Sequence, residues 1–481
     1  MTKSIRRTGK QIAFAIAIII GATVSMASIA TIAAAQDIKN YSRATLQEWL
    51  DKYSGAKPDF KPGDVLTQKD LERMRPFLPP GYLEQLNFPE MKAEIIATRD
   101  HTPRKDFMEC SEKYQPQVKI NPDGTLANYL CGEPFSDDAL NPSDPLSGLK
   151  SAYNFDYRWQ NYGEFSLNFM FIYDRFGEKR GSEPIIVEPP LEDWIAGVPY
   201  TSKLPSDVTR DYRGGGNFQR TAGSFYQRLY LTHLAPLASS GGVLNVPDAK
   251  NFFWKEFEGF ISPFDVRGEV IINYRYSDPK RADDAWVYDP KLRRVRRISV
   301  EVKSDSVAGT EQTVDDFYTF SGRVLAWNWK FLGWKDLLCV FDAKDDYPHF
   351  NGPNGQVPDD VWSIRRFAVV ERSPKAPNHP YSSVVMFWDA QNWFPWLAFA
   401  FTRDKKLYKT WGLQHKWSED FKEFAEFNHG VHDSTLQSEV VVDVQRERAT
   451  IFAGYGTGNP NVTLEQAKRV FDINKLEEAH R

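Results

Sequence analysis

"SSVVMFWDAQNWFPWLAFAFTRDKKLYKTWGL", residues 382–413, is the stretch that decides the fold. It holds three runs rich in β-branched and aromatic residues, separated by the polar sequences DAQN (389–392) and RDKK (403–406). Runs of this kind with short polar turns between them predict three antiparallel strands. Phe and Trp occupy both alternating positions of the runs, so we expect both faces of this sheet to be covered, or one face to border an apolar cavity.

The rest of the chain repeats the strand pattern. SLNFMFIYDR (166–175) and GEVIINYRY (268–276) read as further strands, and aromatic residues make up 14% of the chain. Helical patterns are confined to the ends: Ser42 can cap a helix, Thr67 and Asp70 resemble a capping box, and residues 462–481 read as a helix. Closely spaced strands without regular helices between them favour an antiparallel sheet. The predicted fold class is therefore mainly β with flanking helices.

The N-terminus has the pattern of a secretory signal. Four basic residues within the first ten precede an uncharged, mostly apolar run from Gln11 to Ala35, which ends in three alanines. This order of basic, apolar and small residues predicts a signal peptide over residues 1–35 and a periplasmic mature chain. Because the run is long enough to span a bilayer, an uncleaved inner-membrane anchor is the alternative.

Charge and length narrow the class of protein. The formal net charge is −4, and without residues 1–35 the balance is 56 basic against 64 acidic side chains, a net charge of −8. This balance argues against a nucleic-acid partner. The sequence SDDALNPSDPLSG (136–148) interrupts the periodic segments and suggests a boundary. The predicted organisation is a signal peptide (1–35), an N-terminal helical segment and hairpin (36–145), an antiparallel β domain (146–455) and a C-terminal helix (456–481).

Four motifs carry a resemblance to a known family. They are NPDGTLANYLCGEPF (121–135), DPLSGLKSAYNFDYRW (144–159), WVYDPKLRRVRRISV (286–300) and GTEQTVDDFYTFSGRVLAWNWKFLGWKDLL (309–338). In order and spacing they resemble the landmarks of an uncharacterised family of exported Gram-negative proteins, a domain of unknown function. That family is grouped with the outer-membrane lipoprotein-sorting (LolA/LolB-like) superfamily. The resemblance runs from about Tyr41 to beyond Trp417.

The resemblance implies more about the fold than about the activity. It implies a strongly curved antiparallel sheet, an open half-barrel lined by apolar side chains and plugged by helices, which related proteins use to hold acyl chains. It also implies an association with envelope exporters of the resistance-nodulation-division type. The family has no settled activity, so no ligand residues follow from it.

The cysteines fit an exported protein. Cys110 and Cys131 flank the turn at Asn121–Gly124, on what we expect to be the two arms of a hairpin. In an oxidising compartment a disulfide is the first interpretation, whereas a zinc site lacks both the spacing and a histidine pair. Cys339 is left over and is expected to be a small buried residue.

Five basic residues crowd into positions 291–297, which is unusual in an acidic chain. Strand alternation would point Arg294 and Arg296 to one side and Arg293 and Arg297 to the other. In one interpretation these arginines form structural ion pairs with carboxylates on neighbouring strands, Asp315 and Asp316 being the candidates. A polybasic contact with anionic lipid is a further interpretation, which the acidic surroundings such as Glu301 weaken.

A sharper interpretation makes the arginines part of a ligand site. Arg294 and Arg296 would then hold the anionic head of an amphiphile at the mouth of an apolar cavity, because guanidinium groups suit such heads. The cavity would be lined or covered by aromatic residues of the strand run that opens this section. These are Phe387, Trp388, Trp393, Phe394 and Trp396.

Signs of catalysis are weak. Asp315 and Asp316 would point to opposite sides of a strand, which suits paired acid–base chemistry poorly. His429, His432 and Asp433 form a short cluster that is more typical of a solvated loop than of a metal site. We therefore expect no cofactor and no enzyme activity, and predict a periplasmic binding or carrier protein for a hydrophobic or amphiphilic, lipid-like ligand. The alternatives are a structural or partner-binding envelope protein with a fully packed sheet and, last, an exported hydrolase.

Overall fold

The computed structural model describes residues 38–159, 163–174, 182–184, 209–211, 216–298, 306–307, 309–458 and 471–473. The expected signal peptide (1–35) lies outside these residues, as does most of the expected C-terminal helix (456–481). Residues 456–458, which the sequence assigned to that helix, complete a β-strand instead. None of the helices in the described ranges is long and apolar enough to cross a bilayer.

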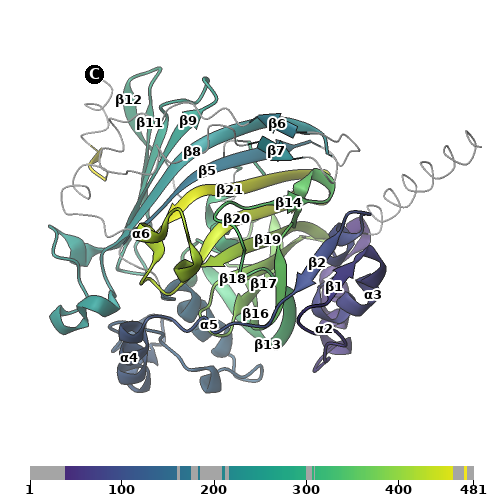
Figure 1. The fold of residues 1–481 in the computed structure, drawn as a ribbon. Coiled ribbons are helices and arrows are strands. Elements are labelled where there is room, and N and C mark those ends of the chain that lie inside the picture. The colour runs from purple at the N-terminus through teal and green to yellow at the C-terminus, as the bar shows by residue number, and fades with distance from the viewer. Residues whose placement is uncertain are drawn as a thin grey trace, which may run out of the picture.

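One large sheet dominates the structure (Figure 1). Its strands follow one another in space as β1 (Val65–Thr67), β2 (Lys92–Ile95), β16 (Val361–Pro374), β17 (Tyr381–Asp389), β18 (Pro395–Thr402), β19 (Leu407–Trp417), β20 (Ser434–Asp443), β21 (Arg448–Gly458), β5 (Gly163–Tyr173), β8 (Phe218–Tyr230), β9 (Phe252–Ser262), β10 (Val270–Tyr276), β11 (Asp284–Asp289) and β12 (Arg294–Ile298), with β13 (Trp327–Cys339) also paired to β16. Three small ladders join β3 (Lys119–Ile120) to β4 (Leu126–Ala127), β6 (Ser182–Pro184) to β7 (Thr209–Asp211), and β14 (Phe350–Asn351) to β15 (Val357–Pro358).

The large sheet is curved and open. Its strand pairs are antiparallel except for the short parallel contact of β2 with β16. Figure 1 shows β21, β5 and β8 arched side by side across the molecule. The order of the described strands ends at β1 and at β12, so they do not close into a barrel. A mainly β fold with a curved antiparallel sheet and flanking helices is therefore confirmed.

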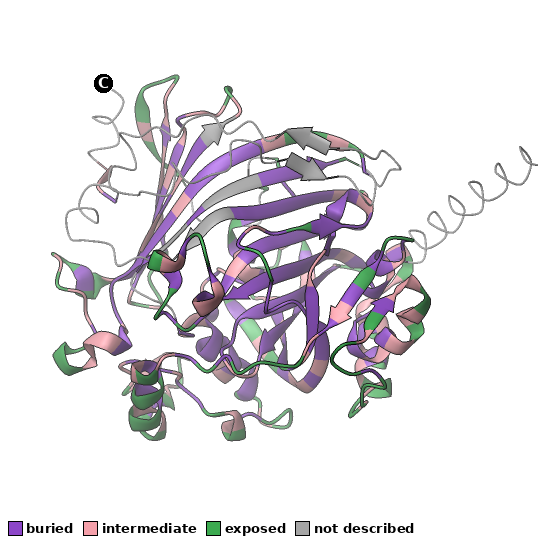
Figure 2. Cartoon of the chain, viewed as in Figure 1, coloured by how far each residue is buried: buried purple, intermediate pink, exposed green. Residues whose placement is uncertain are grey.

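The stretch at 382–413 forms three neighbouring strands as predicted, namely β17, β18 and the start of β19. Their alternating side chains enter two separate cores. On β18, Phe399 packs in the core that includes the N-terminal segment, while Ala398 and Ala400 face the core that includes helix α5 (Ser147–Asp156). Figure 2 shows these central strands almost entirely buried. Of the two arrangements expected for this run, coverage of both faces is the one observed.

The N-terminal segment covers one face of the sheet. Its helix α2 (Arg43–Lys52) begins at Ser42, whose side chain accepts a hydrogen bond from the backbone of Thr45, and the capping box at Thr67 and Asp70 is present as predicted. Helix α3 (Leu71–Met74) and several short turns follow before β2. Tyr82 from this segment packs edge-on against Trp396 of β18, with ring centroids 5.7 Å apart. The segment thus shares a core with the sheet.

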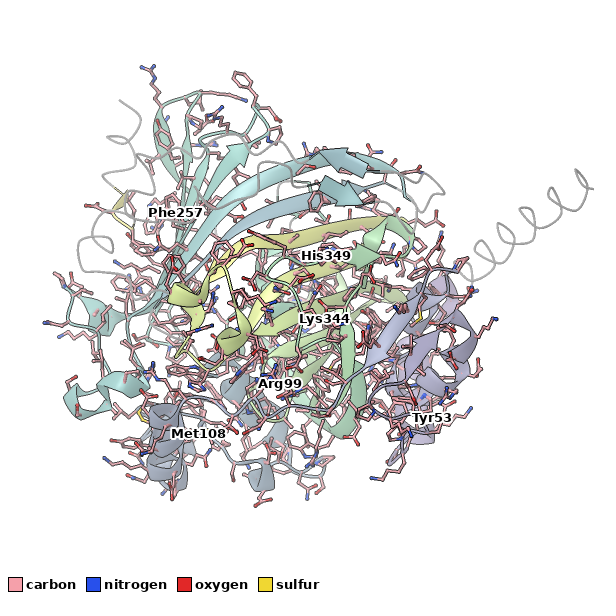
Figure 3. The ribbon with its side chains drawn as sticks, viewed as in Figure 1. Tyr53, Arg99, Met108, Phe257, Lys344 and His349 are labelled. Carbon is pink, nitrogen blue, oxygen red and sulfur yellow. A yellow bond between two sulfur atoms is a disulfide. The ribbon has the colours of Figure 1, made fainter. Side chains whose placement is uncertain are left out.

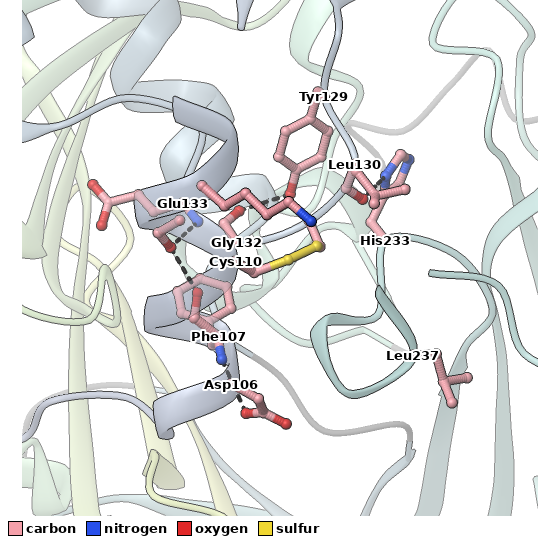
Figure 4. Close-up of a disulfide and its surroundings, with 12 residues drawn as sticks. Asp106, Phe107, Cys110, Tyr129, Leu130, Gly132, Glu133, His233 and Leu237 are labelled. Atoms are coloured by element: carbon pink, nitrogen blue, oxygen red, sulfur yellow. Dashed lines mark hydrogen bonds between the residues drawn. A yellow bond between two sulfur atoms is a disulfide. The ribbon is translucent and has the colours of Figure 1, made fainter. Parts of the chain in front are cut away.

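The predicted disulfide joins Cys110 to Cys131 (Figure 4). Cys110 lies on helix α4 (Lys105–Tyr114) and not on a hairpin arm as expected. The hairpin between the two cysteines consists only of β3 and β4. The Ser111 hydroxyl accepts a hydrogen bond from the backbone of Glu133 and donates one to Phe107. Cys339 is free and buried, as expected.

Helix α5 lies directly on β13. At Gly148 an added Cβ would come within 2.4 Å of the Lys330 backbone nitrogen, so only glycine permits this approach. Further along the helix, Phe155 stacks on Trp388 of β17, with ring centroids 4.2 Å apart and planes 17° apart. The helix therefore covers the second face of the sheet. Helix α6 (Ala425–Asn428) is a single turn near β20.

Candidate ligand-binding site

The five aromatic residues predicted to line a cavity lie in packed cores. Their side chains are at most 6% exposed, and they divide between the two faces of the sheet. Trp388 and Trp393 belong to the face that α5 covers, and Phe387, Phe394 and Trp396 to the face that the N-terminal segment covers. In the described structure they therefore do not form a single surface.

The predicted arginines lie far from these aromatics in the sheet. β12 is the last strand of the order, and eight strands separate it from β18. Arg294 and Arg296 are exposed, and Arg297 donates a hydrogen bond to Asp284 of β11. The strand and its alternation are as predicted, but Arg293 lies in the preceding turn with a left-handed φ of 48°. The proposed head-group arginines and cavity aromatics are thus not brought together.

Asp315 and Asp316 lie in a 3-10 turn over Val314–Thr319, not in a strand. Asp316 accepts hydrogen bonds from Arg372 of β16 and from the Tyr381 hydroxyl, the latter at 2.8 Å. Arg372 also donates to the backbone carbonyl of Asp315 at 3.4 Å. Both aspartates are buried. The cation that pairs with Asp316 is therefore on β16, 56 residues further along the chain, rather than on β12.

Residues 309–326, which we call the plug, lie across the face of the sheet that α5 covers. Gln312 accepts a hydrogen bond from the Trp411 indole at 3.0 Å and donates one to Glu439 at 2.9 Å. Thr319 accepts one from the Trp388 indole at 3.1 Å. Phe317 adds an edge-on contact with Phe452. Polar side chains of β16, β17, β19, β20 and β10 thus bind this one segment.

The plug, the end of α5 and strands β8–β10 enclose a cluster of buried arginines. Arg228 of β8 and Arg275 of β10 each place their guanidinium carbon 4.5 Å from the centre of the Trp254 ring. Arg158, just beyond α5, lies 4.4 Å from the Phe155 ring and 5.4 Å from the Tyr318 ring. All three arginine side chains are less than a tenth exposed. We call this cluster the arginine pocket.

Carboxylates orient two of the arginines. The Nη2 atom of Arg228 donates to Glu256 at 2.8 Å, and that of Arg275 donates to Asp283 at 2.9 Å. Arg275 also donates to the backbone carbonyl of Ser321 in the plug at 2.7 Å. Such bonds hold each guanidinium in one plane, and the plug carbonyls of Ser321 and Gly322 are further acceptors for Arg275.

Two small cavities border Arg158. One, of about 20 Å³, is lined by Arg158, Arg228 and Arg275 together with plug residues such as Tyr318 and Ser321. The other, of about 30 Å³, lies toward Trp159 and His233. Each has room for about one or two water molecules. The volumes are too small for an acyl chain, which needs a site on the scale of roughly 300 Å³ or more.

Burial raises the pKa of Asp156 at this site. Four arginines, namely Arg158, Arg228, Arg275 and Arg323, oppose that rise by their charge. Three carboxyl groups, those of Asp156, Glu256 and Asp283, also lie around the pocket. The cations therefore outnumber the carboxylates by four to three. An anion entering here would meet guanidinium donors, aromatic faces and little water, which are conditions that strengthen charge-assisted hydrogen bonds.

Little in the sequence indicates the arginine pocket. Its three arginines come from segments 70 and 47 residues apart along the chain, so no short motif contains them. A weak signal existed in the strands. Arg228 alternates with Tyr226 and Tyr230, and Arg275 with Asn273, which places polar side chains along one face of otherwise apolar strands.

A second buried cluster has the residue types of a hydrolase triad. His101 faces the Ser434 hydroxyl and an Asp342 carboxylate oxygen, each at 2.9 Å. Asn392 also donates to the Ser434 hydroxyl at 2.7 Å. His101 and Ser434 are both 0% exposed, and His101 stacks on Trp417. A nucleophile enclosed in this way cannot meet a substrate without rearrangement, so the geometry favours a structural network.

The histidines near residue 430 do not converge on a metal site. His429 contacts the backbone carbonyl of Phe421 at 2.8 Å, while His432 is exposed. Across the described ranges, His, Cys, Asp and Glu side chains form no group of three that could hold a metal ion.

Comparisons with known proteins place these features in a family context. The sequence profile of a family described as "Protein of unknown function (DUF1329)" matches residues 208–477. That range includes the plug and two of the three arginines of the pocket. No curated protein matches the chain.

Solved structures give matches at low identity. One is a putative outer membrane lipoprotein-sorting protein domain from Vibrio parahaemolyticus, and another is a DUF1329 family protein from Desulfovibrio piger. Each is 17% identical, covers 69% of this chain and 100% of its own, and gives a TM-score of 0.42. A LolA superfamily protein from Nitrosomonas europaea is 10% identical over 66% of this chain and 94% of its own, with a TM-score of 0.34. Likeness at this level assigns no ligand and no activity.

Proposed function

The chain belongs to the DUF1329 family, as the four sequence motifs indicated, and on that premise we propose that it is a binding or carrier protein for an anionic amphiphile. The observation that carries the proposal is the arginine pocket at the edge of an apolar core. Arg158, Arg228 and Arg275 would hold the anionic group. Phe155 and Phe320, which line the same cavity, begin the apolar surface that would meet the ligand's hydrocarbon part.

The plug would have to shift for such a ligand to enter. The present cavity of about 20 Å³ admits little more than water. Behind the plug lie large apolar side chains, among them Trp388, Trp411 and Phe452. The plug contacts Trp388 and Trp411 through single hydrogen bonds from their indole groups, which a ligand can exchange at a net cost of about 1 kcal/mol each, whereas the buried pair of Arg372 and Asp316 would have to part as well. Movement of this segment would uncover these apolar side chains for the hydrocarbon part of the ligand.

A native mass spectrum of the protein, recovered from the periplasm without detergent and followed by lipid extraction, tests the proposal. A bound amphiphile at one equivalent is expected. In the double variant Arg228→Gln/Glu256→Gln, which removes one arginine of the pocket with its partner, the bound fraction is expected to fall at least about tenfold, as for loss of a charged hydrogen bond.

A matched control exists on the other face of the sheet. Arg43 donates to Glu371 at 2.8 Å in a pair of the same type, so Arg43→Gln/Glu371→Gln should fold and keep its ligand. An empty native protein that also takes up no fluorescent fatty acid would disprove the carrier proposal. The packed positions of the predicted cavity aromatics would then favour a structural or partner-binding protein. A partnership with a resistance-nodulation-division exporter stays a prediction.

A further inference from the structure

Two neighbouring hairpins expose the most accessible large apolar side chains of the described residues. Phe264, in the turn between β9 and β10, is 88% exposed, and Leu292, in the turn between β11 and β12, is 63% exposed. Val270 pairs with Gly259 on one side and with Tyr288 on the other, so both turns lie at the same end of the sheet. Single exposed apolar side chains are common, whereas exposed apolar side chains gathered at one end of a sheet are typical of a contact surface.

The same two turns concentrate positive charge. Residues 263–269 and 289–298 hold six basic and three acidic side chains, in a chain whose formal net charge is −4. Arg297 is paired with Asp284. For Lys291, Arg293, Arg294 and Arg296, which are all exposed, the described part of the chain records no ion pair. Asp289 is engaged in the turn, where it accepts hydrogen bonds from the backbone of Lys291 and Leu292.

We propose that these hairpin tips dock the protein on a bilayer surface that carries anionic phospholipid headgroups. Lys291, Arg293, Arg294 and Arg296 would lie against the phosphates, and Phe264 and Leu292 would enter the boundary between headgroups and acyl chains. Apolar side chains combined with a basic patch are the two signals that together give stable but reversible membrane contact. The proposal explains why an acidic protein places so many arginines on one short hairpin, and it does not depend on the proposed ligand.

Vesicle flotation tests the proposal with two lipid compositions, pure phosphatidylcholine and phosphatidylcholine with one third phosphatidylglycerol. The full chain is expected to float with the anionic vesicles at low salt and to be released at high salt. Arg294→Gln/Arg296→Gln should weaken binding about 25-fold, from about fivefold per charge at a membrane surface. Phe264→Ser/Leu292→Ser should weaken it about tenfold at low salt, where the parent binds.

Two control variants test whether removing cations or an exposed apolar side chain elsewhere on the protein has the same effect as changing the hairpin tips. Lys57→Gln/Lys61→Gln removes two exposed cations of the N-terminal segment, and Met108→Ser removes an exposed apolar side chain of α4, at the far end of the molecule in Figure 3. Both control variants should bind as the parent does. Every variant carries the same residues 1–35, so any membrane affinity of that segment cancels in the comparison. Equal binding to both lipid compositions, or equal loss in control and tip variants, would overturn the proposal.

Discussion

Arg372 of β16 donates a hydrogen bond to Asp316 of the plug, and the two side chains are 0% and 1% exposed. The guanidinium of Arg372 also lies 4.2 Å from the centre of the Trp327 ring. Because the pair is fully withdrawn from water, each partner depends on the other to offset the cost of its burial. The pair therefore ties the plug to the sheet in a way that surface ion pairs cannot.

Replacing Arg372 by Met should lower the free energy of unfolding by about 3–5 kcal/mol, because it leaves the Asp316 carboxylate buried without its cation. Urea denaturation measures this loss. Arg297→Met is the matched control, since Arg297 pairs with Asp284 while remaining 67% exposed, and it should cost less than about 1 kcal/mol. The double variant Arg372→Met/Asp316→Leu should recover much of the loss. Equal effects of Arg372→Met and Arg297→Met would show that burial of the plug pair is not what stabilises it.

The sequence predicted local features better than long-range partners. The strands around 382–413, the cap at Ser42 and the alternation of β12 follow from patterns within a few residues. The partner of Asp316 could not be predicted in that way, because β16 supplies it only once the sheet has formed. Apolar composition also does not distinguish a packed core from a cavity wall, so the sequence predicts Trp388 and Trp396 on the sheet but leaves open whether a core or a cavity surrounds them.

Buried carboxyl groups should make stability fall as pH rises above neutrality. Burial raises the pKa of Glu439 to about 8 and that of Glu258 to about 7, against an ordinary value near 4.5. The folded state then holds protons that the unfolded state has lost, so the free energy of unfolding decreases with rising pH up to about 8. Burial lowers the pKa of His415 to about 4. This group therefore makes the free energy of unfolding rise with pH, but only below about pH 6.5. In the window from pH 6.5 to 8 the histidine no longer contributes, and burial of Lys335, which lowers its pKa to about 8, opposes the carboxyl groups only near the upper end.

Urea unfolding at several pH values in this window is the measurement. Each buried carboxyl group should contribute a slope of up to about 1.4 kcal/mol per pH unit. Glu439→Gln should reduce this dependence of the free energy of unfolding on pH by the contribution of one carboxyl group. This holds even if the substitution also changes the stability at a single pH. Glu72→Gln should leave the slope unchanged, because a hydrogen bond from Arg75 lowers the pKa of Glu72 and this group is ionised in both states throughout the window. A parent protein of constant stability between pH 6.5 and 8 would contradict the assigned pKa directions.

The disulfide between Cys110 and Cys131 should stabilise the segment that carries α4. It closes a loop with a sequence separation of 21 residues, for which the chain-entropy estimate is about 3 kcal/mol. Cys110→Ser/Cys131→Ser should lower the melting temperature by several degrees in calorimetry. Reductant should lower that of the parent similarly and leave the double variant unchanged, because Cys339 is free and buried. A reductant effect that persists in the double variant would point to other chemistry.

Gly148 offers a test of how closely α5 must approach β13. In an exposed helix, replacing glycine by alanine stabilises by about 1 kcal/mol. Here the new Cβ would lie 2.4 Å from the Lys330 nitrogen and 2.5 Å from the Trp329 carbonyl carbon. Both are backbone atoms, which cannot rotate away as a side chain can. Gly148→Ala should therefore destabilise the protein by about 1–3 kcal/mol, as overpacking does. Because α5 also carries Phe155 to Trp388, the near-ultraviolet circular dichroism of the aromatic core should weaken in parallel. A stabilised Gly148→Ala variant would mean that α5 can lift from β13 freely, and the helix could then open together with the plug.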